Sequence, residues 1–176
     1  MRIISGKYKG ANIKAPSNIP SRPTTDMAKS GLFNILNNVW NFEAKSVLDL
    51  FSGTGNMAFE FSSRGCFPIT CIEQNRICTQ FIKKFSSQYK MEDFEVIQGD
   101  VFSYLKKSQK HFNIVFADPP YGLPTIKDIP QLVFENNLIK DQGWLIIETD
   151  DRTSFEDHPK LLQKRQYGGS LFWIFE

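Results

Sequence analysis

Residues 46–58 read SVLDLFSGTGNMA, an apolar strand-like segment followed by a glycine turn and the start of a helical segment. Gly53 and Gly55 would allow the backbone to pass close to a ligand, with a helix N-terminus behind it. The spacing fits the G-x-G-x-x-A fingerprint of dinucleotide-binding proteins, and Glu73 follows Gly53 by 20 residues. The motif predicts an α/β fold with a nucleoside-containing ligand. It does not separate a nicotinamide dinucleotide from S-adenosylmethionine.

Strand-like and helical segments alternate through the rest of the chain, which is typical of a doubly wound parallel sheet. We expect strands at 46–51, 67–73, 94–98, 112–117 and 144–148. We expect helices from Thr24 or Thr25 onward, and at 56–63, 76–88, 102–106 and 126–136. Segments 161–167 and 171–175 flank Gly168-Gly169 and predict an antiparallel hairpin at the sheet edge. Because ligands bind beyond the carboxyl ends of such strands, the chemistry should follow the first four strands.

A basic segment precedes this alternation. The first 45 residues hold seven Lys and Arg against two acidic residues, a net +5, whereas the remainder holds 14 against 17, a net −3. We expect short strands at 2–5 and 12–14, then an extended connector at 16–23 that contains three prolines. The predicted division is a basic arm and connector at 1–24 and a main domain at 25–176. Contact with nucleic acid and a solvated hairpin are both compatible with this charge.

Composition excludes several protein classes. The 176 residues are 41% hydrophobic and 23% charged, which is typical of one globular domain with a small appendage. No apolar run approaches the ~20 residues of a membrane helix, and the polar N-terminus does not resemble a signal peptide. The odd number of cysteines, without a C-x-x-C pair, suggests neither a disulfide framework nor a metal site. We therefore expect a soluble, reduced, cytoplasmic protein.

Two acidic residues end the second and third expected strands. Glu73 could accept the two hydroxyl groups of a ribose, or it could be an ordinary loop acid. Asp100 could accept a hydrogen bond from an adenine amine, or it could cap the helix that follows. Both alternatives remain open for both residues at the sequence level.

The fourth strand leads into Asp118-Pro119-Pro120-Tyr121. The two prolines stiffen the loop, so that Asp118 and the carbonyl of Pro119 could both accept hydrogens from one exocyclic nucleobase amine. Such a pair of acceptors would localise the nitrogen lone pair and orient it for attack, while Tyr121 offers a face for base stacking. A dehydrogenase has no use for this loop, so the motif favours group transfer to a base amine.

With these motifs the chain resembles the RsmD family, the class I S-adenosylmethionine-dependent methyltransferases that modify a guanine N2 amine of 16S rRNA. The resemblance covers nearly the whole chain. The matching pieces are Arg2 to Gly10, Arg22 to Asp26, Leu32 to Leu36, Asp49 to Gly55, Ser63 to Gly65, Asp118 to Tyr121 and Tyr167-Gly168. It implies a Rossmann-like fold with a seven-stranded, mostly parallel sheet, a C-terminal antiparallel hairpin and a small N-terminal β-hairpin. The family's target is guanine 966 in standard rRNA numbering.

The resemblance also implies roles for individual residues. Asp118, Pro119, Pro120 and Tyr121 would carry the chemistry. The expected contacts to S-adenosylmethionine are Asp49, Gly53 and Gly55 near its methionyl part, Glu73 at the ribose, Asp100 at the adenine, and Arg22 and Thr24 close to the active site. RNA contacts are expected from Lys7, Lys9 and Lys14. The implied partner is 16S rRNA in an assembled or partly assembled small subunit, and a monomer is the expected state. Lys29 and Ser30 stand where the family commonly carries an Arg-Glu pair.

The expected reaction begins with a guanine flipped out of its stack, because its amine cannot otherwise reach a sulfonium methyl group. Asp118 would hold the amine, but a carboxylate with an ordinary pKa near 4 is a weak base. Whether it takes the proton therefore stays open. Two alternatives also stay open. One is a methyltransferase acting on amino groups of DNA or another RNA, and the other is a non-catalytic RNA-binding assembly factor.

Overall fold

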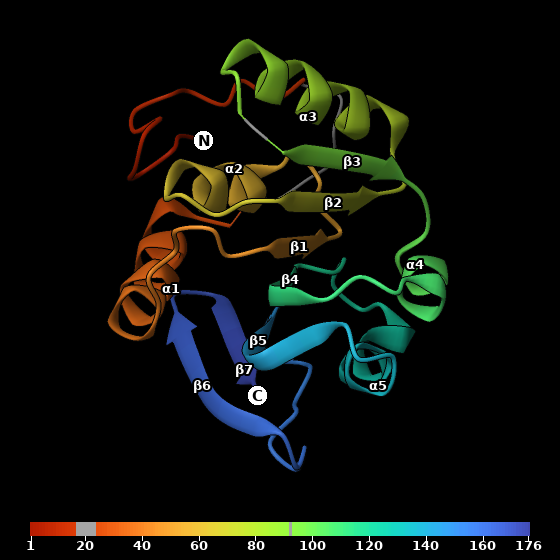
Figure 1. Ribbon diagram of the computed structural model, residues 1–176. Helices are drawn as coiled ribbons and strands as arrows, with labels where there is room; N and C mark the ends of the chain where they lie inside the picture. Colours follow the sequence, from red (N-terminus) through yellow and green to blue (C-terminus); the bar gives the residue numbers. More distant parts are fainter. Residues whose placement is uncertain (17–23, 92) are drawn as a thin grey trace.

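The computed structural model describes residues 1–16, 24–91 and 93–176 and forms one seven-stranded sheet in the order β3-β2-β1-β4-β5-β7-β6 (Figure 1). The strands are β1 Val47–Leu50, β2 Ile69–Glu73, β3 Phe94–Gln98, β4 Phe112–Ala117, β5 Ile139–Thr149, β6 Leu161–Tyr167 and β7 Ser170–Phe175. Strands β1 to β5 pair in parallel, while β7 pairs antiparallel with both β5 and β6. This confirms the mostly parallel, Rossmann-like sheet with a C-terminal antiparallel hairpin.

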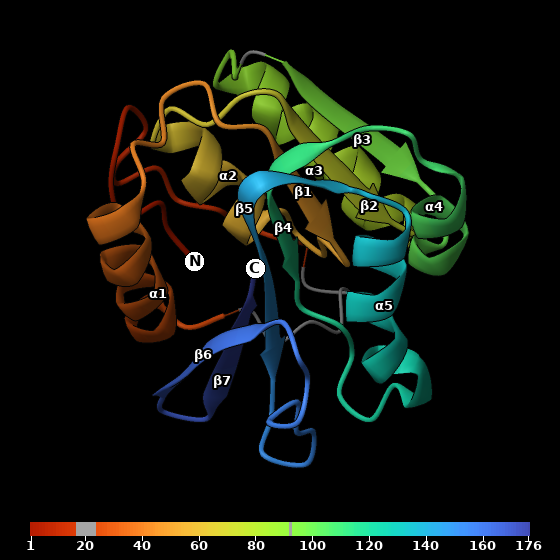
Figure 2. The same ribbon diagram turned by 60° about the horizontal axis from the view of Figure 1, so that its bottom comes forward.

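Helices cover both faces of the sheet (Figures 1 and 2). They are α1 Asp26–Val39, α2 Asn56–Ser63, α3 Arg76–Gln88, α4 Val101–Lys107, the 3-10 turn η1 Pro124–Lys127 and α5 Asp128–Glu135. Helices α1, α2 and α3 contribute buried side chains to one hydrophobic cluster, and α4, α5 and η1 contribute to the other. The start of α1 confirms the predicted cap, because the Thr25 side chain accepts a hydrogen bond from the Ala28 amide. No helix in the described ranges is long and apolar enough to cross a membrane.

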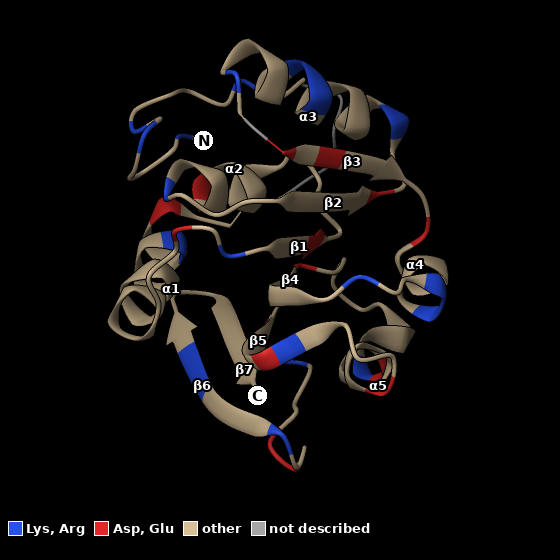
Figure 3. Cartoon of the chain, viewed as in Figure 1, with Lys and Arg blue, Asp and Glu red and all other residues tan. Residues whose placement is uncertain are grey.

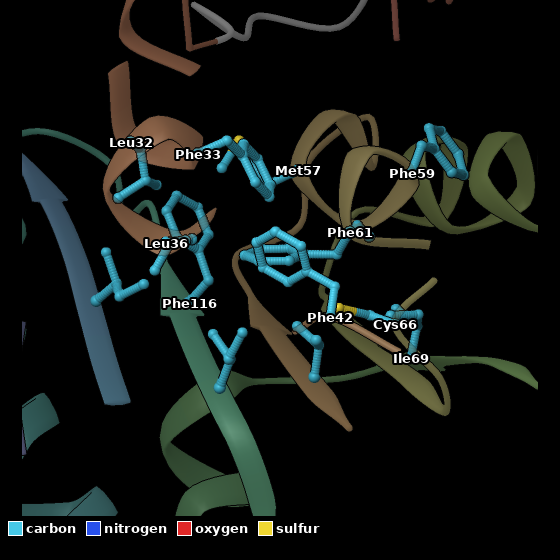
Figure 4. Close-up of a cluster of buried hydrophobic side chains, with 14 of the residues drawn as sticks. Leu32, Phe33, Leu36, Phe42, Met57, Phe59, Phe61, Cys66, Ile69 and Phe116 are labelled. Carbon is cyan, nitrogen blue, oxygen red and sulfur yellow. The ribbon is translucent and has the colours of Figure 1, made fainter. Parts of the chain in front are cut away.

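Aromatic side chains fill the cluster beneath α1 and α2 (Figure 4). Phe33 of α1 meets Phe61 of α2 with ring centroids 4.8 Å apart, and Phe61 in turn lies 6.4 Å from Phe116 of β4. These edge-on and tilted contacts join the two helices to the centre of the sheet. They hold α2 against the sheet, directly after the glycine turn that precedes this helix.

Two elements differ from their sequence predictions. Strand β5 begins at Ile139 rather than near residue 144, and its register against β4 shifts between Phe112 and Ile114. The sequence hid this extension because residues 140–143 are polar or glycine, and Gln142 also has an irregular backbone with a φ of 62°. The N-terminal β-hairpin is present only as a loop closed by one antiparallel bridge, between Arg2 and Asn12.

The topology places the ligand site. From β1 the chain runs outward to β2 and β3, then returns to β4 on the other side of β1. The connections after β1 and β4 therefore diverge at their carboxyl ends, which is the point where doubly wound sheets bind ligands. The connector at 16–23 lies outside the described residues except for Pro16.

Candidate active site

A pocket of about 440 Å³ opens at this divergence, beyond the carboxyl ends of β1 to β4. It brings together nine of the residues predicted from the sequence. These are Thr24, Asp49, Gly53, Glu73, Asp100, Asp118, Pro119, Pro120 and Tyr121. Residues from segments up to about 100 positions apart in the chain thus share one cavity.

The glycine turn shapes the floor of the pocket. Three residues of this turn have positive φ: Phe51 at 58°, Gly53 at 53° and Gly55 at 76°. A Cβ on Gly53 would meet only the Phe51 carbonyl oxygen, at 3.9 Å, so this glycine leaves open space for a ligand. A Cβ on Gly55 would lie 2.9 Å from the Phe59 ring, so Gly55 serves helix packing and does not line the cavity. The two glycines of the fingerprint are therefore needed for different reasons: Gly53 leaves space for a ligand, and Gly55 allows close packing against Phe59.

Asp49 is a buried acid of the pocket with a carboxyl oxygen unpartnered among the described residues. It lies on β1 with 2% of its surface exposed, and its Oδ2 has no hydrogen-bond partner in the described part of the chain. The pKa of this carboxyl is raised to about 8, chiefly by burial and to a smaller extent by the nearby Glu73, although hydrogen bonds from Ser52 and Ala58 oppose the shift. A buried acceptor without a partner is costly, so the site favours a ligand that brings a donor or a positive charge.

Glu73 and Asp100 already hold backbone groups. The Glu73 carboxylate accepts the Gly53 amide at 2.8 Å and the Asn75 amide at 2.7 Å, so it fixes the glycine turn to the end of β2. A carboxylate has about four acceptor positions, which leaves capacity for ribose hydroxyls. Asp100 caps α4 by accepting the Ser103 amide at 2.8 Å. The capping alternative for Asp100 is confirmed, and the residue still lines the pocket.

Asp118 begins the loop after β4, and its amide donates to the Leu50 carbonyl of β1 at 3.4 Å. Burial raises the pKa of the Asp118 carboxyl well above its ordinary value, and the negative charges of Glu148 and Asp49 raise it further. The assumption of an ordinary pKa near 4 is therefore wrong for this carboxyl. Beside it, the Tyr121 side chain is 42% exposed at the pocket, where a planar group could stack on it.

The predicted RNA contacts lie outside the pocket. Lys7, Lys9 and Lys14 are exposed on the N-terminal arm, where Figure 3 colours the positions of Lys and Arg blue. The Lys7 amide donates to the carbonyl of Ser63, the last residue of α2, whereas the pocket adjoins the first turn of that helix. An eight-residue helix is about 12 Å long, so the tip of the arm is well separated from the pocket. Arg22 lies outside the described residues.

The sequence did not predict several residues that line the pocket, notably Phe51, Asn56 and Cys78. Glu148 of β5 was also missed, although its carboxylate accepts the Thr24 hydroxyl at 2.6 Å. No local pattern marks Asn56 or Glu148, because their partners are distant in sequence. Only the strand order could have placed Glu148 beside the Asp118 loop. Within the described residues, no group of three or more His, Cys, Asp or Glu could hold a metal ion.

Comparison with known proteins gives a consistent result. The family model described as "Conserved hypothetical protein 95" matches residues 1–176. A Buchnera aphidicola protein named "Ribosomal RNA small subunit methyltransferase D" is 33% identical, over 86% of this chain and 76% of its own length. The Escherichia coli protein of the same name is 30% identical over 85% and 75%. The solved Escherichia coli protein yhhF, described as a proposed methyltransferase, superposes with a TM-score of 0.85 at 28% identity, over 99% of this chain and 96% of that one.

Proposed function

The chain belongs to the conserved hypothetical protein 95 family, the RsmD family of class I methyltransferases, and we propose that it transfers a methyl group from S-adenosylmethionine to the N2 amine of a guanine in 16S rRNA. One observation carries the proposal. The glycine-turn cradle and the Asp118-Pro119-Pro120-Tyr121 loop line the same pocket. A cofactor site and a base-amine site therefore adjoin each other.

The residues of the pocket fit S-adenosylmethionine. The unpartnered, buried Oδ2 of Asp49 suits a cationic amino group, since a positive charge offsets the cost of burying the carboxylate. The open space at Gly53 admits a ligand close to the backbone, and Glu73 keeps acceptor capacity for hydroxyls. When bound, this cofactor supplies an electrophilic methyl group on a sulfonium. Asp49, Gly53, Glu73 and Asp100 would hold it.

Asp118 and the Pro119 carbonyl then hold the attacking amine. Both are hydrogen-bond acceptors, so they select an N–H donor and turn its lone pair toward the cofactor side of the pocket. Nitrogen gains positive charge during the transfer, and the Asp118 carboxylate stabilises that charge. In its ionised form, a carboxylate with a raised pKa is a better proton acceptor than an ordinary aspartate, and we propose that Asp118 in this form takes the amine proton.

The substrate class follows from the relatives and from charge. The two curated relatives are named for the small-subunit ribosomal RNA, and the first 45 residues of this chain carry a net +5. The arm's lysines lie outside the pocket, so they would contact phosphates distant from the target base. A wide contact of this kind fits an RNA already folded in a small subunit. We propose that the protein acts there as a monomer in the bacterial cytoplasm.

Substitution Asp118→Asn tests the proposed chemistry. Asparagine keeps the size of the side chain but removes the carboxylate, so methyl transfer should fall by about 100-fold or more. Affinity for S-adenosylhomocysteine, measured by calorimetry, should change little, because Asp118 is assigned to the amine. The exposed Asp151→Asn serves as the matched control. Transfer near the wild-type rate in Asp118→Asn would refute the assigned role.

A further inference from the structure

Lys29 is a fully buried lysine in α1, with no exposed side-chain surface. Its ammonium group lies 2.7 Å from the Arg2 carbonyl, 2.9 Å from Asn56 Oδ1 and 3.3 Å from a Glu60 carboxylate oxygen. These three acceptors match the three N–H groups of an ammonium. Burial lowers the pKa of Lys29, while Glu60 opposes that shift. One charge thus joins the N-terminal arm, α1 and α2.

Glu60 anchors the arm on α2. Its carboxylate accepts the backbone amides of Ile4 at 2.8 Å and Ser5 at 3.1 Å, and it pairs with Arg64 at 2.8 Å. The carboxylate would therefore keep three favourable partners without Lys29. Removing the lysine ammonium need not leave an uncompensated buried charge, which is the usual reason that breaking a buried ion pair unfolds a protein.

Asn56 links Lys29 to the ligand pocket. An ammonium can only donate, so it fixes the amide oxygen of Asn56 toward Lys29 and turns the amide nitrogen toward the Thr24 carbonyl, 3.2 Å away. Asn56 and Thr24 both line the ligand pocket. The Thr24 hydroxyl then donates to Glu148 at 2.6 Å. Glu148 follows Ile147, which pairs with Ala117, so it lies beside the start of the Asp118 loop.

We infer that Lys29 is a positioning residue of the active site, because its ammonium orients the Asn56 amide and thereby holds the Thr24 wall of the pocket. The same charge seats the N-terminal arm, so arm docking and pocket shape are set together. The inference rests on the proposed function only for its choice of S-adenosylhomocysteine as the ligand in the second readout.

Lys29→Met and Arg64→Met form a matched pair for the test. Both remove a cation that pairs with Glu60, but only Lys29 contacts Asn56. The first readout needs no ligand: the Asn56 side-chain amide hydrogens should lose protection from exchange, measured by NMR, in Lys29→Met only. The second is affinity for S-adenosylhomocysteine, which should fall about tenfold in Lys29→Met and stay within about twofold in Arg64→Met.

A double-mutant cycle separates positioning from general damage. Asn56→Leu removes the same link from the other side, so Lys29→Met/Asn56→Leu should bind no more weakly than the weaker single variant. Additive losses, equal losses in Arg64→Met, or an unchanged Asn56 amide in Lys29→Met would each overturn the inference. If Lys29→Met does not fold, Lys29→Gln takes its place, with the same expected losses relative to Arg64→Met. A wild-type protein that binds S-adenosylhomocysteine without methylating 16S rRNA would contradict the proposed function and leave this inference standing.

Discussion

Two neighbouring carboxyls set the residue-scale chemistry of the pocket. Asp49 and Asp118 both have a raised pKa, chiefly because they are buried. In the unfolded chain an aspartate titrates near pH 3.9. Between that pH and the raised pKa, the folded protein binds more protons than the unfolded chain does, so the free energy of unfolding falls as pH rises. These two pocket acids therefore destabilise the folded protein at higher pH.

Asp49→Asn should remove one of these contributions. The melting temperature of the wild-type protein should fall between about pH 4 and pH 8, and the variant should show a shallower fall. The difference should be about 2–4 °C per pH unit, from on the order of 1 kcal/mol per unit. Thermal unfolding without cofactor measures it, with the exposed Asp141→Asn as control. Parallel curves for wild type and Asp49→Asn would contradict the cause assigned to the shift.

Local sequence predicted the residues of the pocket better than their partners. The glycine turn and the Asp118 loop follow apolar strands, so their places at the sheet edge follow from topology. Lys29, Glu60 and Glu148 are buried through contacts with distant segments, and nothing in their neighbourhoods predicts burial of a charge. The raised pKa of Asp118 comes chiefly from burial and then from the charge of Glu148, 30 positions away, and it was missed for the same reason.

The N-terminus of helix α4 belongs both to the fold and to the pocket. Asp100 caps α4 and also lines the pocket. Asp100→Ala should lose the cap and about 1 kcal/mol of stability. Asp100→Ser should keep the cap but withdraw the longer carboxylate, so stability should hold while affinity for S-adenosylhomocysteine falls. Thermal unfolding and calorimetry on both variants distinguish the two roles. If Asp100→Ser binds S-adenosylhomocysteine as tightly as the wild-type protein does, Asp100 does not contact the adenine.

Elements with a clear hydrophobic period were predicted closely, as α3 shows, whose observed bounds are Arg76–Gln88. Elements held by backbone contacts were not. The N-terminal arm lies on α2 through amides that donate to Glu60, and it forms one bridge in place of two strands. The start of β5 is likewise set by pairing with β4 rather than by its own polar residues.

At the scale of the whole molecule, the arm lies along α2 from the pocket end to the far end. Met1 approaches Thr54 beside the pocket, whereas Tyr8 contacts Tyr89 after α3, with ring centroids 6.1 Å apart. A nucleic acid that contacted both the arm and the pocket would therefore lie across one side of the molecule. This extent fits a structured RNA particle better than a short single strand.

Methyl transfer to a guanine of small-subunit RNA can be tested directly. The most direct measurement incubates the protein with radiolabelled S-adenosylmethionine and small ribosomal subunits that lack the guanine mark, then maps the labelled nucleotide. We expect label on the N2 amine of a single guanine, position 966, and almost none with Asp118→Asn. No label despite confirmed cofactor binding, or label on an adenine or cytosine amine instead, would contradict the proposed function.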